Sequence, residues 1–378
     1  MAPEVEVQEV RTRCDLRAFV LFPWQVYRGD PHWVPPLISQ RLDYLTPARN
    51  PVLQSADVVL YLARRGRRVL GTVAALAEHQ VLRQPAEGVG TFGFFEVVDD
   101  YPVARKLLEA VREWARARGL SSLRGPYNLT SSEAPGVLVG GAACPPVMLT
   151  AHTPPYYQTF LERFGLEKYE DGYAWRVFRS QIGDRLQGVP EVFTRVARMA
   201  RSRGVSVRKA RLDRWDEEVA TAHYLFNTTL THLPGYVPMP EADFRRFAAD
   251  LRSLLDPDLA LFAELDGRVV GFCVSIPDPN RALIHLNGRL FPLGWLKLWY
   301  YTRRIDVLTF KLMGVLPEYR FRGIEAVLFL EALQAMVARG YRWLEGSVTS
   351  EHNVLVNRVA ERFGAERYKH YRIYQMAV

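Results

Sequence analysis

Alternating apolar and polar positions predict two similar β-hairpins, one in each half of the chain. The first covers residues 57–76 around a basic, glycine-bearing turn, and the second covers 258–276 around Asp266-Gly267. Gly71 and Gly271, in the second strand of each hairpin, are 200 residues apart. A repeated pattern at such a spacing indicates a duplicated structural unit.

Two further matches keep the same order along the chain. Residues 162–165 recur as 361–364 at an offset of 199, in each case before a strand rich in aromatic residues. A helix followed by a strand over 107–125 recurs over 329–346, at an offset of about 221. The drift in offset locates about 21 extra residues before the central helix of the second copy and about 22 after the fifth strand of the first. These inserts are where we expect the copies to differ in function.

The repeats predict an α/β (α+β) fold of two tandem domains, each a mixed, mostly antiparallel sheet flanked by helices. A segment with proline and glycine at 183–190 places the boundary, so we expect domains over 1–182 and 183–378. The length of 378 residues suits two domains. The alternative is that two unrelated α/β domains resemble one another by chance.

Composition predicts a globular protein of a reducing compartment. Hydrophobic residues make up 48% and charged residues 24%, and the three cysteines are too far apart for a disulfide framework. The N-terminus lacks the apolar core of a signal peptide, and no stretch of about 18 residues is uniformly apolar. We therefore expect a cytoplasmic protein, either soluble or peripheral to a membrane.

A net charge of +8 raises the question of a nucleic-acid partner. Only six of the 49 basic residues are lysines, the arginines are scattered along the chain, and no nucleic-acid-binding motif accompanies them. We expect no nucleic acid, although the positive charge suits a phosphorylated co-substrate or an acidic membrane surface. The eight histidines show no metal-ligand spacing, so no metal site is expected.

A candidate phosphate site follows the apolar strand at 307–316. The strand leads into a basic, glycine-bearing turn and then a long apolar helix that ends near Arg339. Such a turn directs backbone N–H groups and the positive end of the helix at one point, where a pyrophosphate can bind. The first copy has Asp100 and Tyr101 where the second has Arg322 and Gly323, which makes a good helix start but a poor anion site. We expect the first copy to act as a scaffold or as a wall of the substrate pocket.

At this turn the sequence resembles the GNAT superfamily of acyl-CoA N-acyltransferases. The superfamily signature is Arg or Gln, two residues, Gly, one residue, then Gly or Ala; Arg320 and Gly323 match it, whereas Glu325 occupies the last small position. The resemblance implies acyl-CoA as a co-substrate, with no permanently bound cofactor, and an oxyanion donor on the backbone near Val315 or Leu316. The residues it implies for acyl-CoA binding are Val315, Leu316, Arg320, Phe321, Arg322, Gly323, Ile324, Glu325, Ala326 and Asn353.

The superfamily also places a tyrosine, the usual proton donor to the leaving thiolate, seven residues after the position of Asn353. Here that position is Ala360. The nearest tyrosines are Tyr368 and Tyr371, and we take Tyr371 as the candidate general acid.

A closer resemblance covers nearly the whole chain. The segments that carry it are 22–27, 30–37, 92–96, 124–126 and 154–157, which are similar to the bacterial ceramide synthase-like family. These proteins are single-chain, GNAT-related and of this size. The resemblance implies transfer of a fatty acyl group from a thioester to the amine of a long-chain base.

The insert of the second copy, 285–304, is mostly apolar and aromatic, with Trp295 and Trp299 one helical turn apart. Tryptophan and tyrosine flanked by arginine suit a membrane interface or a tunnel for a hydrocarbon chain, so both tryptophans are candidate substrate contacts. The alternative is a helix packed on its own domain.

The insert of the first copy, 125–141, is polar and then glycine-rich. Asn128 and Glu133 are its candidates for holding or deprotonating an amine, and the alternative is a surface loop with capping residues.

Amine acylation needs a base, and the candidates are Glu133, His285 and Glu351. The sequence thus predicts an acyl-CoA-dependent N-acyltransferase whose acceptor is a small-molecule or lipid amine. Two other hypotheses remain open: a catalytically degenerate protein that binds a lipid or a partner, favoured by Glu325 and Ala360, and an acyltransferase fed by aminoacyl-tRNA. The sequence leaves the oligomeric state open.

Overall fold

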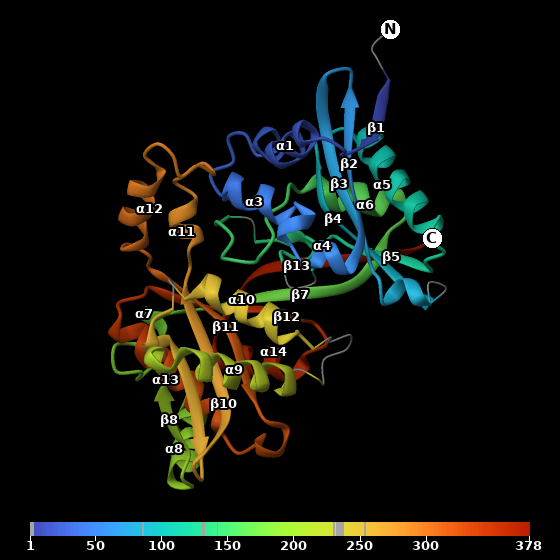
Figure 1. Cartoon of the computed structure of the whole chain (residues 1–378). Helices are drawn as coiled ribbons and strands as arrows, with labels where there is room; N and C mark the ends of the chain where they lie inside the picture. The colour runs from blue at the N-terminus through green and yellow to red at the C-terminus, as the bar shows by residue number, and fades with distance from the viewer. Residues whose placement is uncertain are drawn as a thin grey trace.

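One mixed sheet runs through both halves of the protein in the computed structural model (Figure 1). The structure describes residues 4–84, 87–130, 133–141, 143–229, 231, 238–252 and 255–378. Among these the strand order is β1-β2-β3-β4-β5-β13-β7-β12-β11-β10-β9-β8, and β6 also pairs with β13. The strands are β1 (Val5–Glu9), β2 (Ala56–Arg65), β3 (Arg68–Glu78), β4 (Val89–Val97), β5 (Ser122–Gly125), β6 (Val137–Gly140), β7 (Glu167–Phe178), β8 (Ser206–Lys209), β9 (Ala260–Leu265), β10 (Arg268–Pro277), β11 (Val307–Val315), β12 (Trp343–Ser350) and β13 (Glu366–Ala377).

Fourteen α-helices of the described chain flank this sheet. They are α1 (Arg13–Leu21), α2 (Pro23–Val26), α3 (Ile38–Tyr44), α4 (Val52–Ser55), α5 (Tyr101–Arg116), α6 (Tyr156–Phe164), α7 (Arg179–Ile182), α8 (Glu191–Ser202), α9 (Trp215–Thr229), α10 (Glu241–Leu251), α11 (Asn280–Leu283), α12 (Gly294–Thr302), α13 (Ile324–Ala338) and α14 (Val354–Phe363).

The repeat seen in the sequence is present in the structure as two hairpins and two parallel strand pairs. The hairpins are β2–β3 and β9–β10, and the parallel pairs are β4–β5 and β11–β12, while all other pairings are antiparallel. Each parallel pairing spans only three residue pairs and ends at Thr91–Arg124 or at Thr309–Glu345, although the strands continue. Each half therefore contains a gap between two diverging strands.

The two halves exchange their last strands. Strand β7 ends the first half, 1–182, yet it lies between β12 and β13 of the second half, 183–378. Strand β13 pairs with β5, β6 and β7, which all belong to the first half. Figure 1 shows both strands crossing the middle of the molecule. The domain boundary expected at residue 183 therefore remains a prediction. In the structure the two halves share one sheet.

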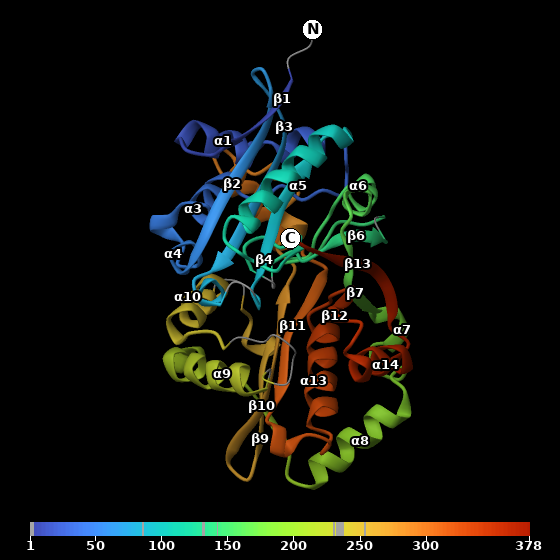
Figure 2. The ribbon, with the colours of Figure 1, turned by 90° about the vertical axis from the view of Figure 1, so that its right-hand side faces the viewer.

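Each half has its own hydrophobic core on one face of the sheet. In the first half, α5 and α6 bury Leu107, Trp114 and Tyr157 against the strands. In the second, α8 and α13 bury residues such as Leu328 and Met336. Figure 2 shows α13 along β11, with α9 and α10 on the other side of β10. The first turn of α13 is thereby fixed at the open end of the gap between β11 and β12.

The insert of the second half reaches across to the first. Helices α11 and α12 lie beside α3 in Figure 1. Trp24 donates its indole N–H to Asn287 Oδ1 at 2.7 Å, and the Ile38 N–H donates to the Gly288 carbonyl at 2.9 Å. These bonds hold the segment after α11 against α2 and the start of α3 in the first half.

Candidate active site

The N-terminus of α13 forms the anion-binding corner expected from the sequence. Gly323 caps the helix with φ +82°, a left-handed conformation that favours glycine, and a Cβ there would lie 2.8 Å from Val196 Cγ1 of α8. The first internal bond of the helix runs from the Val327 N–H to the Gly323 carbonyl, so the N–H groups before it point out of the helix end. Arg322 is exposed beside them, its guanidinium 5.1 Å from the Tyr319 ring.

The other residues assigned to this corner have different surroundings. Phe321, at φ +61°, is 90% exposed, Ile324 is buried in the core, and Glu325 and Ala326 are half-buried in the first turn of α13. Among the residues described, Glu325 is the one carboxylate in that turn. It lowers the positive charge that Arg322 contributes to the corner.

Arg320 ties the turn to its neighbours. Its guanidinium donates to the Thr229 carbonyl at 2.7 Å and to the Val315 carbonyl at 3.3 Å. These two bonds join the turn to α9 and to the end of β11. The side chain therefore positions the turn.

The backbone of β11 faces the gap at alternate residues. The Leu316 N–H donates to the Val270 carbonyl at 2.9 Å, so it faces β10. Because consecutive residues of a strand direct their N–H groups to opposite edges, the Val315 N–H is directed toward the gap. Of the two candidate oxyanion donors, Val315 has the required orientation.

Buried charged groups surround the narrow end of the gap. Glu345 is fully buried, and within the described structure neither of its carboxylate oxygens has a hydrogen-bond partner. Lys311 Nζ lies 3.6 Å from Glu345 and donates to the Met148 carbonyl at 2.8 Å. Lys369 is buried nearby, and burial lowers the pKa of its ammonium to about 8. Such groups call for a polar ligand or water between them.

Tyr371, the candidate acid, belongs to this region. Its side chain is 2% exposed, and burial raises the pKa of its hydroxyl. It packs in one apolar cluster with Trp343 and Tyr368. The hydroxyl is therefore neutral at physiological pH.

In the first half the corresponding gap is filled by the protein's own chain. The Tyr127 N–H donates to the Phe92 carbonyl at 2.7 Å, and Asn128 Oδ1 accepts from the Phe94 N–H at 3.0 Å. A Cβ on Gly93 would lie 1.5 Å from the Tyr127 carbonyl oxygen, so only glycine permits this contact. The helix start of this half is held by an Arg65–Asp100 ion pair at 3.2 Å. These features close the first gap to an extended ligand.

A cavity of about 390 Å³ lies in the first half and extends to the second. Asn280 and Leu283 of α11 form part of its wall, and so does Met148, whose carbonyl binds Lys311. Most of the remaining wall is apolar, as with Phe19, Val20, Trp33, Leu37, Phe95 and Leu149. The cavity therefore adjoins the narrow end of the gap between β11 and β12.

Two carboxylates face this cavity. Glu133 is paired with Arg41 at 2.9 Å, and Arg41 lies 5.2 Å from the Phe94 ring. Glu96, on the diverging part of β4, accepts a hydrogen bond from the Tyr157 hydroxyl at 2.7 Å. Burial raises the pKa of Glu96 to about 7, and its half-buried side chain lines the cavity. Asn128 also lines the cavity, although its Oδ1 is used in the bond to Phe94.

The other predicted residues do not line this cavity. His285 is exposed and stacks on Tyr301 at 3.7 Å, and Glu351 is held by Lys168 at 2.8 Å, which lowers its pKa despite partial burial. Asn353 caps α14 by accepting from the Val356 N–H at 3.3 Å. Trp295 and Trp299 are 53% and 57% exposed, so these two rings are not packed in a core. Of the three candidate bases, the structure places only Glu133 at the cavity.

Sequence reasoning missed Glu96, Glu345 and Lys369. Glu96 follows three phenylalanines within 92–95, and an acid at the end of such a buried strand is a signal that could have identified it. Glu345 stands in β12 and Lys369 in β13, and they approach each other only because these two strands flank the exchanged β7.

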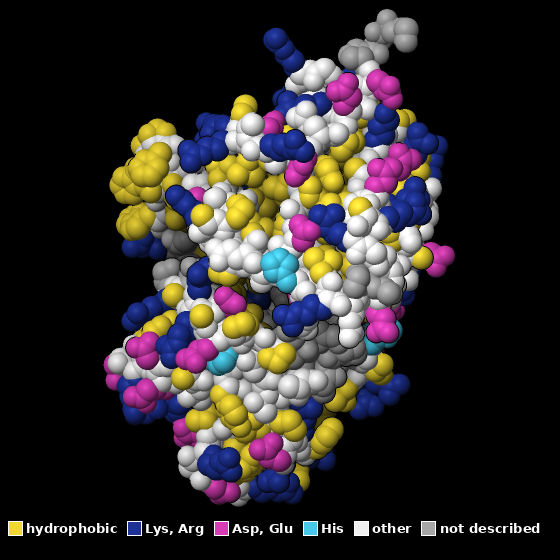
Figure 3. Space-filling view, turned by 45° about the vertical axis from the view of Figure 1, so that its right-hand side comes forward, with side chains coloured by type: hydrophobic (Ala, Val, Ile, Leu, Met, Phe, Trp, Pro, Cys, Tyr) yellow, Lys and Arg dark blue, Asp and Glu magenta, His cyan; other side chains and the backbone are white. Residues whose placement is uncertain are grey.

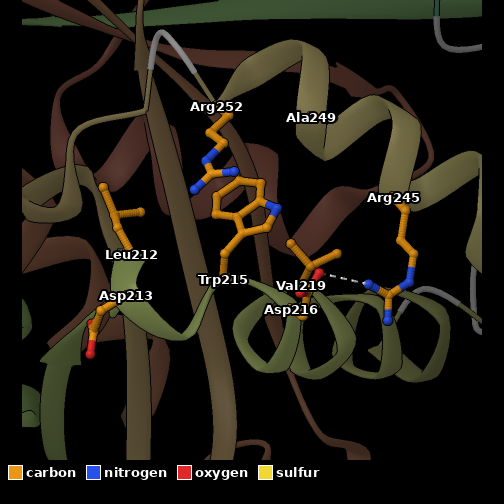
Figure 4. A pocket seen from close by; sticks show the side chains of 8 residues that line it. All are labelled: Leu212, Asp213, Trp215, Asp216, Val219, Arg245, Ala249 and Arg252. Atoms are coloured by element: carbon orange, nitrogen blue, oxygen red, sulfur yellow. Dashed lines mark hydrogen bonds and ion pairs between the residues drawn. The ribbon is translucent and has the colours of Figure 1, made fainter.

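A second hollow, of about 520 Å³, lies between α9 and α10 (Figure 4). Both of its arginines are engaged: Arg245 pairs with Asp216 at 3.2 Å, and Arg252 covers the Trp215 ring at 4.9 Å. We assign no chemistry to it. Within the described ranges, no group of three or more His, Cys, Asp and Glu side chains has metal-binding geometry. Across the same residues, every helix is too short or too polar to traverse a lipid bilayer.

Comparison with solved structures defines the fold. A tandem GNAT protein from the clavulanic acid biosynthesis pathway matches with a TM-score of 0.59 and 14% identity, over 99% of this chain and 98% of its own. A GCN5-related N-acetyltransferase from Sphaerobacter thermophilus matches with a TM-score of 0.53 and 14% identity, over 100% and 97% of the two chains. The fold is therefore that of the tandem GNAT N-acyltransferases, as the sequence predicted.

Sequence comparison then identifies the family. The chain is 33% identical to the bacterial ceramide synthase of Caulobacter vibrioides, over 99% of this chain and 98% of that protein. It is 32% identical to protein YghO of Escherichia coli, over 96% and 93% of the two chains. No family profile matches. The chain belongs to the bacterial ceramide synthase family, which confirms the second resemblance.

Proposed function

We propose that the protein is an acyl-CoA-dependent N-acyltransferase that transfers a fatty acyl group to the amine of a long-chain base. The observation that carries the proposal is the gap between β11 and β12, which begins at the N-terminus of α13 and ends beside an apolar cavity with two carboxylates. In the first half the same gap is filled by residues 127–128. The name of the Caulobacter relative supports the choice of a lipid amine.

Each part of the gap suits one part of a thioester. The N–H groups at the start of α13 and Arg322 would hold the diphosphate, as helix N-termini commonly do. The gap-facing backbone of β11 would pair with the extended pantetheine arm, and the Val315 N–H is a donor for the tetrahedral oxyanion. Tyr371 is the candidate for returning a proton to the leaving thiolate.

The test is acyl transfer by the purified protein. Palmitoyl-CoA and acetyl-CoA are each supplied with a saturated long-chain 2-amino-1,3-diol, and the amide is detected by mass spectrometry together with release of free thiol. We expect palmitoyl-CoA to be the better donor. Failure to transfer from any thioester, with retention of a bound lipid, would instead favour the non-catalytic lipid-binding role that Glu325 and Ala360 suggested.

Two charge-reversal variants distinguish local diphosphate binding at the start of α13 from an effect of net charge on KM. Arg322→Glu should raise KM for palmitoyl-CoA about tenfold or more, because it replaces a cation by an anion at the helix end. Arg116→Glu, at an exposed site in the last turn of α5, changes the net charge equally and should leave KM unchanged.

The proposal also includes a subcellular localisation. We infer that the protein works in the cytoplasm at a membrane surface, since its proposed acceptor is a lipid. Six apolar side chains around α12 are exposed: Phe291, Leu293, Trp295, Leu296, Trp299 and Tyr300. Figure 3 shows hydrophobic side chains gathered where α12 lies. Arg303 and Arg304 lie against the Trp299 and Tyr300 rings, at 3.9 and 4.0 Å, as expected for an interface with anionic lipid.

A further inference from the structure

We propose that the acceptor amine binds in the first-half cavity and that Glu96 removes its proton. This inference rests on the proposed function and deepens it, because it gives the first half a chemical task. The acceptor class is a primary amine on a hydrocarbon chain, with the ammonium at Glu96 and the chain against the apolar wall. The thioester reaches the reaction from the second half, so the site is built from both halves.

The position of Glu96 carries the argument. Its carboxylate lies on the part of β4 that no longer pairs with β5, and it is held by the Tyr157 hydroxyl of α6 at 2.7 Å. One oxygen is thereby fixed while the side chain still lines the cavity. A carboxylate that is held by the neutral hydroxyls of Tyr157 and Tyr27 in a largely apolar cavity is a strong site for an ammonium group.

The other carboxylate of the cavity is already engaged. Glu133 Oε1 is paired with Arg41 Nη1 at 2.9 Å, and Arg41 also lies over the Tyr44 and Phe94 rings. This pair neutralises Glu133 and places one cation near Glu96. Glu96 therefore is the carboxylate of the cavity whose charge an incoming ammonium would balance.

The groups around Glu96 determine its behaviour with pH. Tyr157 and Tyr156 face it from α6, Tyr27 from the turn after α2, and Arg41 from α3. The His152–Asp30 pair, at 2.7 Å, lies farther along the same wall. Burial raises the pKa of Glu96 to about 7, while the tyrosine bonds and Arg41 partly oppose that shift. A carboxyl with a pKa near the working pH can both accept and release a proton.

The reaction balances with these groups alone. The Glu96 carboxylate takes one proton from the ammonium, and the free amine lone pair attacks the thioester carbonyl carbon. The C–N bond forms, the C–S bond breaks, and the second amine proton goes to the thiolate to give free CoA. Glu96 then releases its proton to solvent as the amide leaves.

The acylation assay with palmitoyl-CoA and the long-chain amino diol tests the assignment. Glu96→Gln should lower kcat about 100-fold or more at pH 7, while the thermal shift caused by palmitoyl-CoA stays unchanged. In the wild type, kcat/KM should fall tenfold per pH unit below about pH 7, as Glu96 becomes protonated. Glu96→Gln should lose that limb and recover activity as the pH approaches the pKa of the amine itself, where no base is needed.

Two variants keep the result decisive. Glu96→Asp should retain the acid limb with a reduced kcat, which separates proton removal from a merely structural role. Glu345→Gln alters a buried carboxylate at the narrow end of the gap; loss of the acid limb there, with an unaffected Glu96→Gln, would overturn the proposal. Wild-type kinetics in Glu96→Gln would overturn it as well. Absence of amide formation by the wild type with any thioester would instead contradict the proposed function.

The dependence of kcat/KM on the chain length of the amine tests where the hydrocarbon part of the acceptor binds. Each methylene that the cavity buries is worth about fourfold in kcat/KM, so amines of increasing chain length should improve until the cavity is filled. A flat dependence on chain length, with Glu96→Gln still inactive, would place the chain outside the cavity and overturn the assigned acceptor class.

Discussion

At the scale of single residues, Gly323 is the position at which backbone geometry and ligand binding meet. Its φ of +82° disfavours any side chain, and a Cβ would clash with Val196. Gly323→Ala should destabilise the protein by about 1–3 kcal/mol and also abolish the thermal shift caused by palmitoyl-CoA, since the turn must move.

The control for that change lies at the other end of the same helix. Gly340 follows α13 with φ +79°, and a Cβ there would meet nothing within 4 Å. Gly340→Ala should cost about 1 kcal/mol without affecting the thermal shift. Equal loss of acyl-CoA response in both variants would mean that α13 as a whole, and not the Gly323 turn, is what the ligand requires.

The buried Lys369 should make the free energy of unfolding depend on pH. Burial lowers the pKa of its ammonium to about 8, below its usual value near 10.4 in an unfolded chain. Between these two pH values the unfolded state binds more protons, so the Lys369 contribution to the free energy of unfolding should rise with pH.

The comparison of wild type with Lys369→Met isolates this effect. From pH 8 to pH 10, the wild type should gain about 1–3 kcal/mol relative to the variant, measured by urea unfolding. Parallel curves for the two proteins would show that Lys369 is not protonated differently in the folded and unfolded states.

At the scale of elements, α12 is a helix without a core-facing side. Its nine residues include none that is buried, and its exposed Trp299 lies against Arg303. The double variant Trp295→Ser, Trp299→Ser should reduce co-sedimentation with vesicles containing phosphatidylglycerol about tenfold or more, because each indole contributes on the order of 1–2 kcal/mol of apolar burial.

Helix α14 supplies a control with similar exposure. Val354 and Leu355 are 50% and 62% exposed there. Val354→Ser, Leu355→Ser should leave vesicle binding unchanged, while both proteins keep their melting temperature. Binding lost equally in both variants would indicate nonspecific hydrophobic adsorption, and binding that persists in the α12 variant would exclude this helix as the contact.

The elements that the sequence predicted well are those with local patterns. The hairpins around Gly71 and Gly271 and the turn at Gly323 depend on alternation and turn residues within a few positions. The partners of β7 and β13 could not be predicted, because both strands have the same aromatic pattern and either could pair with either half. The same holds for the site residues. The turn before α13 is predicted from a local pattern, whereas the roles of Glu96 and Glu345 depend on how segments distant in the sequence pack together.

At the scale of the whole molecule, the exchange of strands makes the two halves dependent on one another. Both neighbours of β7 come from the second half, and all neighbours of β13 come from the first. Residues 1–182 expressed alone would therefore leave β7 with both edges unpaired and would expose an edge of β5. Unpaired strand edges of this kind favour aggregation.

Splitting the chain at residue 183 tests this dependence. Residues 1–182 alone should be insoluble or unfolded, whereas co-expression with 183–378 should restore a complex that co-purifies by size exclusion. Thermal unfolding of the intact chain should show one cooperative transition, because the shared sheet cannot be lost from one half only. A folded, monomeric 1–182 fragment with its own sharp transition would contradict the exchange. Such a fragment would contain the acceptor cavity without the thioester gap. In the intact chain the two are joined at Met148, whose carbonyl accepts a hydrogen bond from Lys311 of the second half.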